Sequence, residues 1–578
     1  MRPHRPVFMA TEHAVSAGHY LASEAGLAIL NAGGNAVDAG VAAGLTIGVV
    51  QSDFVNIAGV APTLIWMANT RRVVCIDGLG IWPAAVTPEL FQREHRGVVP
   101  VGLLRTVVPA APHAWLTALE RFGTMRFADV AQAAIRCARD GFAMYPLMSD
   151  HILENIDGYR MWAENTRIYL PGGQPPVVGR RFVQSDLAGT LQYMADQERA
   201  RGGSREDGIV AARDAFYRGD IAAAICDYHA AHGGLLTRKD MADFRVRLEP
   251  TVVGRFRDLD VHCCGPWCQG PALAQVLGML DGVDLAALGH NSPAYVHTLV
   301  ESVKLAFADR ERWFSDPNFQ DVPLEGLLDP DYLAARRGLI DPRRAPPIAP
   351  PGDPVKRRAL GDHLPPSAGG PAPNPDPHAT DPRNPDTSYL CVMDRHGNVF
   401  SATPSDVSSD TPVIPGTGLC PSSRGSQSRP EPDHPASVAP GKRPRLTPNP
   451  AMVLRDGRPV MAFGTPGGDV QVQAMAQVLI NRMVFGMDMQ CAIEAPRFAT
   501  YSYPSSFAPN TTHPGLLMLE SRIDAAVRGA LGALGHRPDA WPEWTYKAGA
   551  VCAIHADHDE GVLHAGADPR RATYAMGR

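Results

Sequence analysis

The sequence predicts a globular protein that contains both α-helices and β-strands, and two kinds of apolar periodicity indicate this. Apolar residues recur at helical spacing in 294-AYVHTLVESVKLAFADRERWF-314. They alternate at strand spacing in 251-TVVGRFRDLDVHCC-264. Helix and strand signals of these kinds alternate along the chain to about Leu339. The chain is therefore expected to combine both elements within one large fold.

The individual elements follow from the same patterns and from turn residues. Residues 16–50 predict two helices, because Gly33-Gly34 interrupts the helical spacing between them. Turn sequences such as Asp456-Gly457 predict hairpins where they separate two apolar alternations. The further predicted elements are a helix over 130–142, a hairpin over 387–405 turning at 396–398, a loop over 410–440, a hairpin over 450–468, and a helix over 470–486.

Composition narrows the function classes. Of the 578 residues, 45% are hydrophobic and 20% are charged, which is ordinary for a soluble enzyme and excludes a wholly disordered or fibrous chain. The formal net charge of -6 offers no basic excess to neutralise phosphates, which argues against a nucleic-acid partner. The ten cysteines lack paired C-x-x-C spacing and are expected to be reduced core thiols.

The N-terminal segment carries no recognisable secretory signal, because its basic residues precede no apolar stretch with a small-residue cleavage site. The longest weakly apolar run, Ala39 to Val50, is too short to span a bilayer. A cytoplasmic protein without a membrane partner is the resulting expectation.

A proline-rich tract divides the sequence. Residues 345–386 contain 13 prolines among 42 residues, a density that neither a regular helix nor a central strand tolerates. The tract ends abruptly at Asp386-Thr387, where the first strand of the predicted hairpin begins. A linker between two domains would have this composition, and so would a chain that is cut at the boundary.

Thr387 is a candidate nucleophile because of this position. A threonine hydroxyl needs a base beside it, and the first residue of a chain carries its own α-amine for that purpose. Cleavage of the Asp386-Thr387 bond would create such a terminus. A β-branched residue is also favoured simply as the first residue of a strand, and the boundary alone favours that structural interpretation.

The segment 464-GTPGG-468 lies between a predicted strand and a predicted helix. Glycines at a helix N-terminus leave backbone N–H groups open to a phosphate or to the oxyanion of a tetrahedral intermediate. The Asp469-Val470 that follows is not the Lys-Ser/Thr of a phosphate-binding loop. A tight turn that needs glycine conformations is an equal alternative. His378 and His396 have no spaced partner and are expected at the surface, without a metal.

Taken together, the motifs resemble the γ-glutamyltransferase family of N-terminal-nucleophile hydrolases, in the family's order and over most of the chain. The segments that carry the resemblance are 33-GGNAVDA-39, 140-DGF-142, 216-FYRGD-220, 233-GGLLTRKDMADF-244, 303-VKLAFADRERWFSDPNF-319, 387-TSYLCVMDRHGN-398, 441-GKRPRLTPNPAMV-453, 464-GTPGG-468 and 495-APRF-498.

The resemblance implies an α+β fold, a four-layer αββα sandwich. A large fragment (1–386) and a small fragment (387–578) would form this one catalytic domain together as a heterodimer. A higher oligomer is also compatible with the resemblance. The precursor would cut itself at Asp386-Thr387. Thr387 would attack an amide carbonyl, Ser405 would hydrogen-bond the nucleophile, and the N–H groups of Gly467 and Gly468 would stabilise the oxyanion. No metal or organic cofactor is implied.

Departures from the family's pattern concern the substrate. Leu79 stands where relatives that bind a γ-glutamyl group have an arginine for its α-carboxylate, and Gln427 where they have an aspartate for its amine. Leu446 and Thr447 replace two adjacent serines. A γ-glutamyl head group would lose solvation without these partners, so an apolar acyl group, or one anchored by Arg424, is expected instead.

The first hypothesis is therefore a self-cleaving amidase or acylase acting on a small-molecule amide. A γ-glutamyltransferase or glutathione hydrolase with unusual pocket contacts is the second. A catalytically silent relative that binds a small acid is the third, because 56-NIAGVAP-62 replaces the family's glycine-rich stretch. The retained Thr387, Ser405 and Gly467-Gly468 argue against silence.

Overall fold

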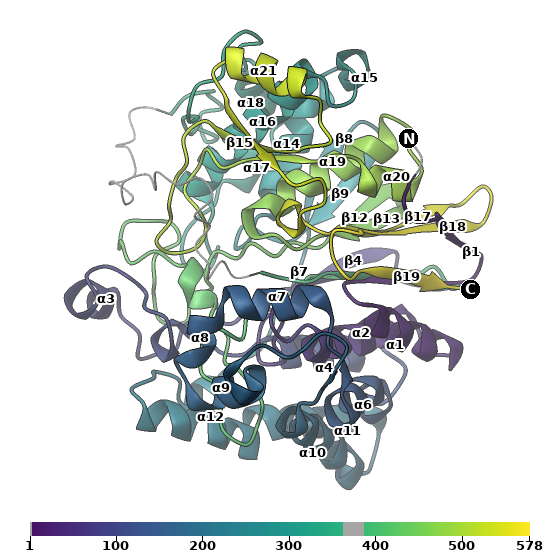
Figure 1. The fold of residues 1–578 in the computed structure, drawn as a ribbon, viewed down its shortest axis with the longest axis vertical. Helices are drawn as coiled ribbons and strands as arrows, with labels where there is room; N and C mark the ends of the chain where they lie inside the picture. The colour runs from purple at the N-terminus through teal and green to yellow at the C-terminus, as the bar shows by residue number, and fades with distance from the viewer. Residues whose placement is uncertain (1–2, 362–385) are drawn as a thin grey trace.

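The protein is built from four layers, with two β-sheets stacked between two layers of helices (Figure 1). The computed structural model describes residues 3–361 and 386–578. In Figure 1 the purple and blue helices lie below the sheets, and the teal, green and yellow helices lie above them. This arrangement confirms the predicted α+β, αββα architecture.

Each central sheet has seven strands, and every pair of neighbours within them is antiparallel. The upper sheet has the order β1 (Phe8–Ala10), β18 (Val562–Ala567), β17 (Cys552–Asp557), β13 (Arg458–Gly464), β12 (Ala451–Arg455), β9 (Leu259–Cys263) and β8 (Val252–Phe256). The lower sheet has the order β19 (Tyr574–Gly577), β2 (Ala14–Ala17), β10 (Leu390–Met393), β11 (Val399–Ala402), β3 (Thr63–Met67), β4 (Arg72–Ile76) and β7 (Leu248–Glu249).

Helices cover the outer face of each sheet. Below the lower sheet lie α1 (Tyr20–Asn31), α2 (Ala36–Val50), α4 (Ala111–Phe122), α6 (Gln132–Asp140), α10 (Ser185–Arg201) and α11 (Arg205–Tyr217). Above the upper sheet lie α14 (Gly270–Asp281), α16 (Pro293–Trp313), α19 (Gln471–Met483) and α20 (Met489–Glu494). No helix in the described ranges is long and apolar enough to cross a membrane.

The elements predicted from periodicity are confirmed. The break at Gly33-Gly34 separates α1 from α2, and Asn35 caps α2 by accepting hydrogen bonds from the N–H groups of Val37 and Asp38. The two predicted hairpins are β10–β11 and β12–β13. Residues 345–361 of the proline-rich tract form neither helix nor strand, and the remainder up to 385 lies outside the described residues.

The space between the sheets is filled by a buried apolar layer. Strands β10 and β11 of the lower sheet pack against β13 and β17 of the upper one. The layer includes Tyr389, Cys391, Met452, Ala462 and Ile554. All ten cysteines are free thiols and nine of them are buried, as the sequence predicts. The faces of β10 and β13 are thereby held together, which positions the residues that precede β10 and follow β13.

Close packing of α2 on the lower sheet generates a stability prediction. A Cβ atom at Gly40 would overlap Cδ1 of Phe400, which belongs to a buried ring of β11. Gly40→Ala should lower the free energy of unfolding by about 1–3 kcal/mol through overpacking, although alanine favours helices intrinsically. The measurement is denaturant or thermal unfolding.

Gly189→Ala is the matched control. Gly189 is an exposed residue of α10, and a Cβ atom there would meet no atom within 4 Å. The same substitution should leave stability unchanged or raise it by up to about 1 kcal/mol. Equal effects at the two sites would contradict the packing argument.

Candidate active site

Thr387 is buried at the point where the chain enters β10. The residue is 1% exposed and forms an antiparallel bridge with Ser405, which follows β11. Its backbone N–H donates to Oδ1 of Asp386 at 2.8 Å. The neighbouring Ser388 donates its hydroxyl to Oε1 of Gln51 at 2.6 Å. These contacts hold the backbone on both sides of Thr387.

A chain of hydrogen bonds joins the two hydroxyl groups to the carbonyl of Asp386. The Ser405 hydroxyl donates to the Asp386 carbonyl oxygen at 2.7 Å, and Oγ1 of Thr387 lies 2.8 Å from Oγ of Ser405. Because the Ser405 hydrogen is used on the carbonyl, the Thr387 hydroxyl donates to Ser405. The pairing predicted between Thr387 and Ser405 is therefore present.

Arg424 is the second donor to this carbonyl. Its Nη2 donates to the Asp386 oxygen at 3.1 Å and also to Oγ of Ser405. Its Nε lies 3.3 Å from Oδ1 of Asp406, and both side chains are buried. The Asp406 carboxylate also accepts hydrogen bonds from Ser422 and Ser423. Burial raises the pKa of Asp406, and the Arg424 guanidinium opposes that rise.

Gly467 and Gly468 lie between β13 and α19, in conformations that other residues adopt rarely. Their φ angles are +119° and +55°. Neither backbone N–H donates a hydrogen bond to another residue in the described part of the chain. Phe507 connects this turn to Arg424, because its ring lies next to Gly468 and 5.9 Å from the guanidinium carbon of Arg424. The turn with the two free amides is therefore connected to the hydroxyl pair through Phe507 and Arg424.

Asp469 does not leave an unpaired negative charge beside these amides. Its Oδ1 lies 2.6 Å from Nη1 of Arg310, and its carboxylate accepts hydrogen bonds from the N–H and hydroxyl of Ser506 at 2.8 and 2.7 Å. Gln269 donates to the same carboxylate. The negative charge of Asp469 is therefore offset by a buried arginine from α16.

The other predicted contact residues divide into two groups. Gln427 accepts from Nη1 of Arg424 at 3.4 Å and donates to Oγ1 of Thr447 at 3.1 Å, so these three residues are connected to Ser405. Leu79 and Leu446 are fully buried members of the apolar layer between the sheets. Substrate contact by any of the five stays a prediction.

Sequence reasoning missed two charged residues of this site. Asp406, which pairs with Arg424, has a φ angle of +117°. Arg571 lies 2.5 Å from Oδ2 of Asp386, although 185 residues separate them. Asp406 could have been suspected from its place directly after Ser405, whereas nothing in the sequence near Arg571 points to Asp386.

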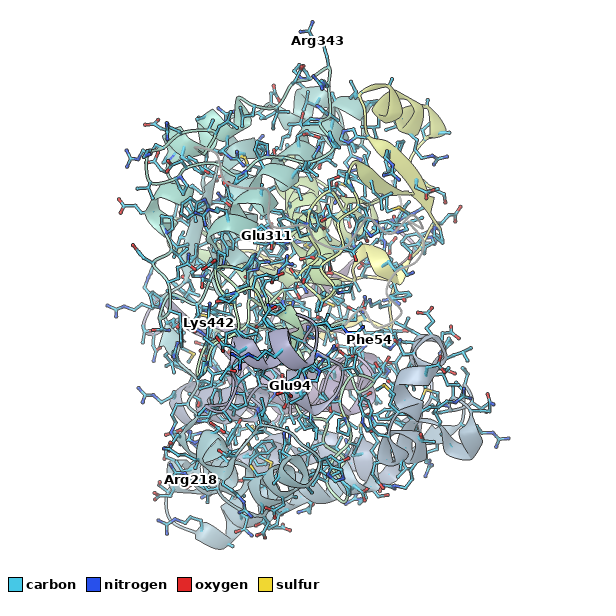
Figure 2. The ribbon with its side chains drawn as sticks, turned by 90° about the vertical axis from the view of Figure 1, so that its left-hand side faces the viewer. Phe54, Glu94, Arg218, Glu311, Arg343 and Lys442 are labelled. Atoms are coloured by element: carbon cyan, nitrogen blue, oxygen red, sulfur yellow. The ribbon has the colours of Figure 1, made fainter. Side chains whose placement is uncertain are left out.

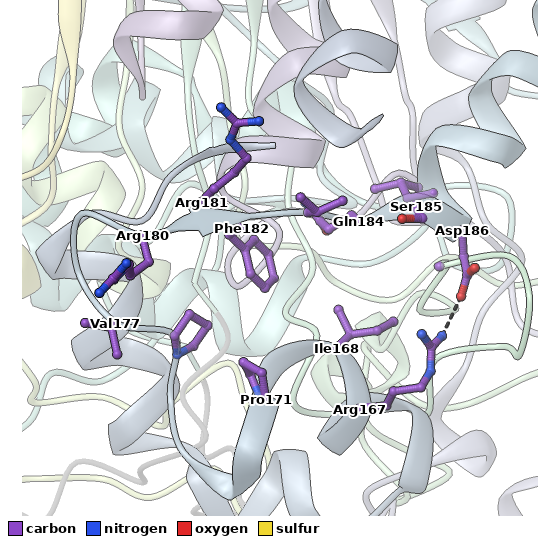
Figure 3. A pocket seen from close by; sticks show the side chains of 14 residues that line it. Arg167, Ile168, Pro171, Val177, Arg180, Arg181, Phe182, Gln184, Ser185 and Asp186 are labelled. Carbon is purple, nitrogen blue, oxygen red and sulfur yellow. Dashed lines mark hydrogen bonds and ion pairs between the residues drawn. The ribbon is translucent and has the colours of Figure 1, made fainter. Parts of the chain in front are cut away.

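Two other features, a pocket and a buried histidine cluster, contain none of the residues of the Thr387 site. A pocket of about 390 Å³ is lined by Arg167, Arg180, Arg181 and their neighbours (Figure 3). Neither Thr387 nor Ser405 belongs to its lining. His297, Glu301 and His536 converge in the interior, within 4.8 Å of one another. Their atoms already have partners there: the two imidazoles meet at 2.9 Å, and Lys304 binds Glu301 at 2.7 Å.

Comparison with known proteins places this chain in a family. The family model described as Gamma-glutamyltranspeptidase matches residues 22–578. The chain is 34% identical over 564 residues to the Acylase ACY 1 proenzyme of Pseudomonas sp. (strain SE83), covering 95% of this chain and 90% of that protein. It is 30% identical over 575 residues to the Oxamate amidohydrolase proenzyme of Klebsiella pneumoniae subsp. pneumoniae, covering 97% of each.

A solved structure shows the same fold. The crystal structure of cephalosporin acylase from Bacillus halodurans superposes with a TM-score of 0.85 at 26% sequence identity, over 100% of this chain and 98% of that one. The resemblance therefore extends over the whole length of both chains.

The free amides after β13 generate a test of the predicted oxyanion site. Gly468→Val should lower kcat for an amide substrate by about 10²–10³-fold, because a side chain at φ +55° displaces the N–H groups from the developing charge. Gly486→Val is the matched control. Gly486 also has a positive φ of +64°, but a Cβ atom there would meet no atom within 4 Å, and the residue lies beyond the far end of α19. Unchanged kcat in a folded Gly468→Val protein would remove this turn from the site.

Proposed function

Because the chain belongs to the γ-glutamyltranspeptidase family and is an N-terminal-nucleophile amidohydrolase, we propose that it cuts its own Asp386-Thr387 bond and then hydrolyses amides through an acyl ester on Thr387. The observation that carries this proposal is the hydrogen-bond chain from Thr387 through Ser405 to the Asp386 carbonyl. The relatives named above are described as proenzymes, which agrees with a cut precursor.

In the self-cleavage step, Oγ1 of Thr387 attacks the carbonyl carbon of Asp386. The C–N bond of the peptide breaks, the Thr387 nitrogen takes up a proton, and water then hydrolyses the resulting ester to leave the Asp386 carboxylate and a free threonine amine. The donors Ser405 and Arg424 support this step, because they bind the carbonyl oxygen on which negative charge develops.

In turnover, the new α-amine of Thr387 accepts the hydroxyl proton while Oγ1 attacks the substrate carbonyl. The amine of the substrate departs with a proton, and water releases the acyl group from the ester. Gly467 and Gly468 supply the N–H groups for the oxyanion. Separate donors would thus serve the two reactions, with Arg424 and Ser405 for self-cleavage and the glycine turn for turnover.

The substrate should be an acylase-type amide, not a γ-glutamyl compound. Leu79 provides no cation for an α-carboxylate, and Gln427 is a neutral group already bonded to Arg424 and Thr447. A γ-glutamyl head group would lose several kcal/mol of solvation at such positions without compensation. Arg424, the cation next to Ser405, already shares its charge with Asp406.

Maturation provides the first test. The purified protein should separate into fragments 1–386 and 387–578 on a denaturing gel, and the smaller should begin Thr-Ser-Tyr on N-terminal sequencing. Thr387→Ala should remain a single 62.0 kDa band, because it lacks the attacking hydroxyl. Ser405→Ala should slow the cut, whereas Ser405→Thr should preserve it. A wild-type chain that stays intact and still hydrolyses amides would contradict the mechanism.

Substrate preference provides the second test. The kcat/KM of the cleaved enzyme should be higher for glutaryl-p-nitroanilide than for γ-glutamyl-p-nitroanilide, because only the second carries an ammonium group that must be desolvated. Both are measured under identical conditions. A γ-glutamyl preference of tenfold or more would replace the acylase proposal by a γ-glutamyltransferase with other pocket contacts.

A further inference from the structure

Arg571 is a buried cation whose carboxylate partner belongs to the residue before the proposed cut. Its side chain is 2% exposed, and its Nη2 lies 2.5 Å from Oδ2 of Asp386 and 3.0 Å from the carbonyl oxygen of Tyr546. The guanidinium carbon lies 5.0 Å from the ring centre of Phe54 and 5.4 Å from that of Tyr546. Phe54 is labelled in Figure 2, near mid-height of the molecule.

Two nitrogens of this guanidinium face no acceptor among the described residues. Nε and Nη1 of Arg571 are buried without a hydrogen-bond partner among the described residues. Asp386 is also the one carboxylate in the described ranges that forms an ion pair with Arg571. A buried arginine with unused donors is suited to bind a carboxylate through two parallel hydrogen bonds. Asp386, its present partner, binds only one nitrogen of the guanidinium.

The Asp386 carboxylate bridges Arg571 and the nucleophile. Its Oδ2 binds Arg571 and its Oδ1 accepts the backbone N–H of Thr387 at 2.8 Å. Self-cleavage turns that N–H into a free amine and makes Asp386 the end of the large fragment. Arg571 can then exchange this carboxylate for another one without any change in the small fragment.

Arg424 does not share this property. Its Nε lies 3.3 Å from Asp406, which is 20 residues inside the small fragment and therefore stays after the cut. Asp406 is itself fixed by Ser422 and Ser423. The cation that loses a covalently tethered partner on cleavage is Arg571.

We propose that in the cleaved enzyme Arg571 binds the carboxylate of the substrate's acyl group, in the position that the Asp386 side chain occupies in the precursor. This inference rests on the proposed function. Counted from its carbonyl carbon, Asp386 is a four-carbon acyl group with a carboxylate at the far end, which is a succinyl skeleton. Short dicarboxylic monoamides are thus the substrate class that reproduces the contact with Arg571 while the carbonyl faces Thr387.

The test compares two anilides on purified, cleaved enzyme. Succinyl-p-nitroanilide carries the carboxylate, and pentanoyl-p-nitroanilide is an uncharged chain of similar length. The wild type should favour the succinyl compound at least tenfold in kcat/KM. Arg571→Met should lower the succinyl value at least tenfold and change the pentanoyl value less than twofold, and Arg571→Lys should lie between. Arg537→Met removes an equal charge at an exposed residue and should change neither value.

Separate readouts keep the two proposals distinguishable. A small fragment beginning Thr-Ser-Tyr establishes cleavage, so an uncut wild-type chain would count against the proposed function alone. Equal kcat/KM for the two anilides, or an undiminished succinyl preference in Arg571→Met, would overturn the role of Arg571.

The loss of Asp386's partner could prevent Arg571→Met from cutting itself. In that case inhibition of the wild-type enzyme tests the proposal. Succinate should inhibit the hydrolysis of pentanoyl-p-nitroanilide competitively. Succinamide, its uncharged counterpart, should inhibit at least tenfold more weakly. Equal inhibition by succinate and succinamide would overturn the proposal.

Discussion

The pairing of β10 with β2 on one side and β11 on the other is the constraint on which the site depends. Strand β2 comes from the chain before Asp386, and β11 comes from the chain after Thr387. The backbone at Thr387 is therefore held by segments from both sides of the predicted cut. Breaking one peptide bond would leave these ladders in place, because β10 is paired with β2 and β11.

The stacking of the two sheets brings the glycine turn after β13 close to Thr387, which precedes β10. Tyr389, two residues after Thr387, packs on Gly464, where a Cβ atom would overlap the tyrosine ring. Gly464 ends β13 and begins the turn that contains Gly467 and Gly468. The distance between nucleophile and free amides is thus set by two sheets packed face to face, and only a residue without a side chain permits this approach at Gly464.

Three buried arginines surround the site, and each has a carboxylate. Arg310 pairs with Asp469, Arg424 with Asp406, and Arg571 with Asp386. Buried pairs of this kind add little net stability, because desolvation opposes the Coulomb attraction, but removing one partner is costly. The first two pairs do not involve a residue at the predicted cut. The third includes the last residue before it, so the proposed cleavage would change the charge balance of that pair.

The sequence by itself determined the elements and the candidate catalytic groups. Local patterns located α1, α2, α16, α19 and both hairpins, because apolar periodicity and turn residues act over a few neighbouring positions. Motif resemblance identified Thr387, Ser405 and the glycine turn, of which the hydroxyl contact is present at 2.8 Å. Only the tertiary structure decided the electrostatics. The arginine partners of Asp469 and Asp386 lie 159 and 185 residues away in the sequence. No local pattern encodes such a partner, because only the packing of the whole chain brings a distant arginine to a buried carboxylate.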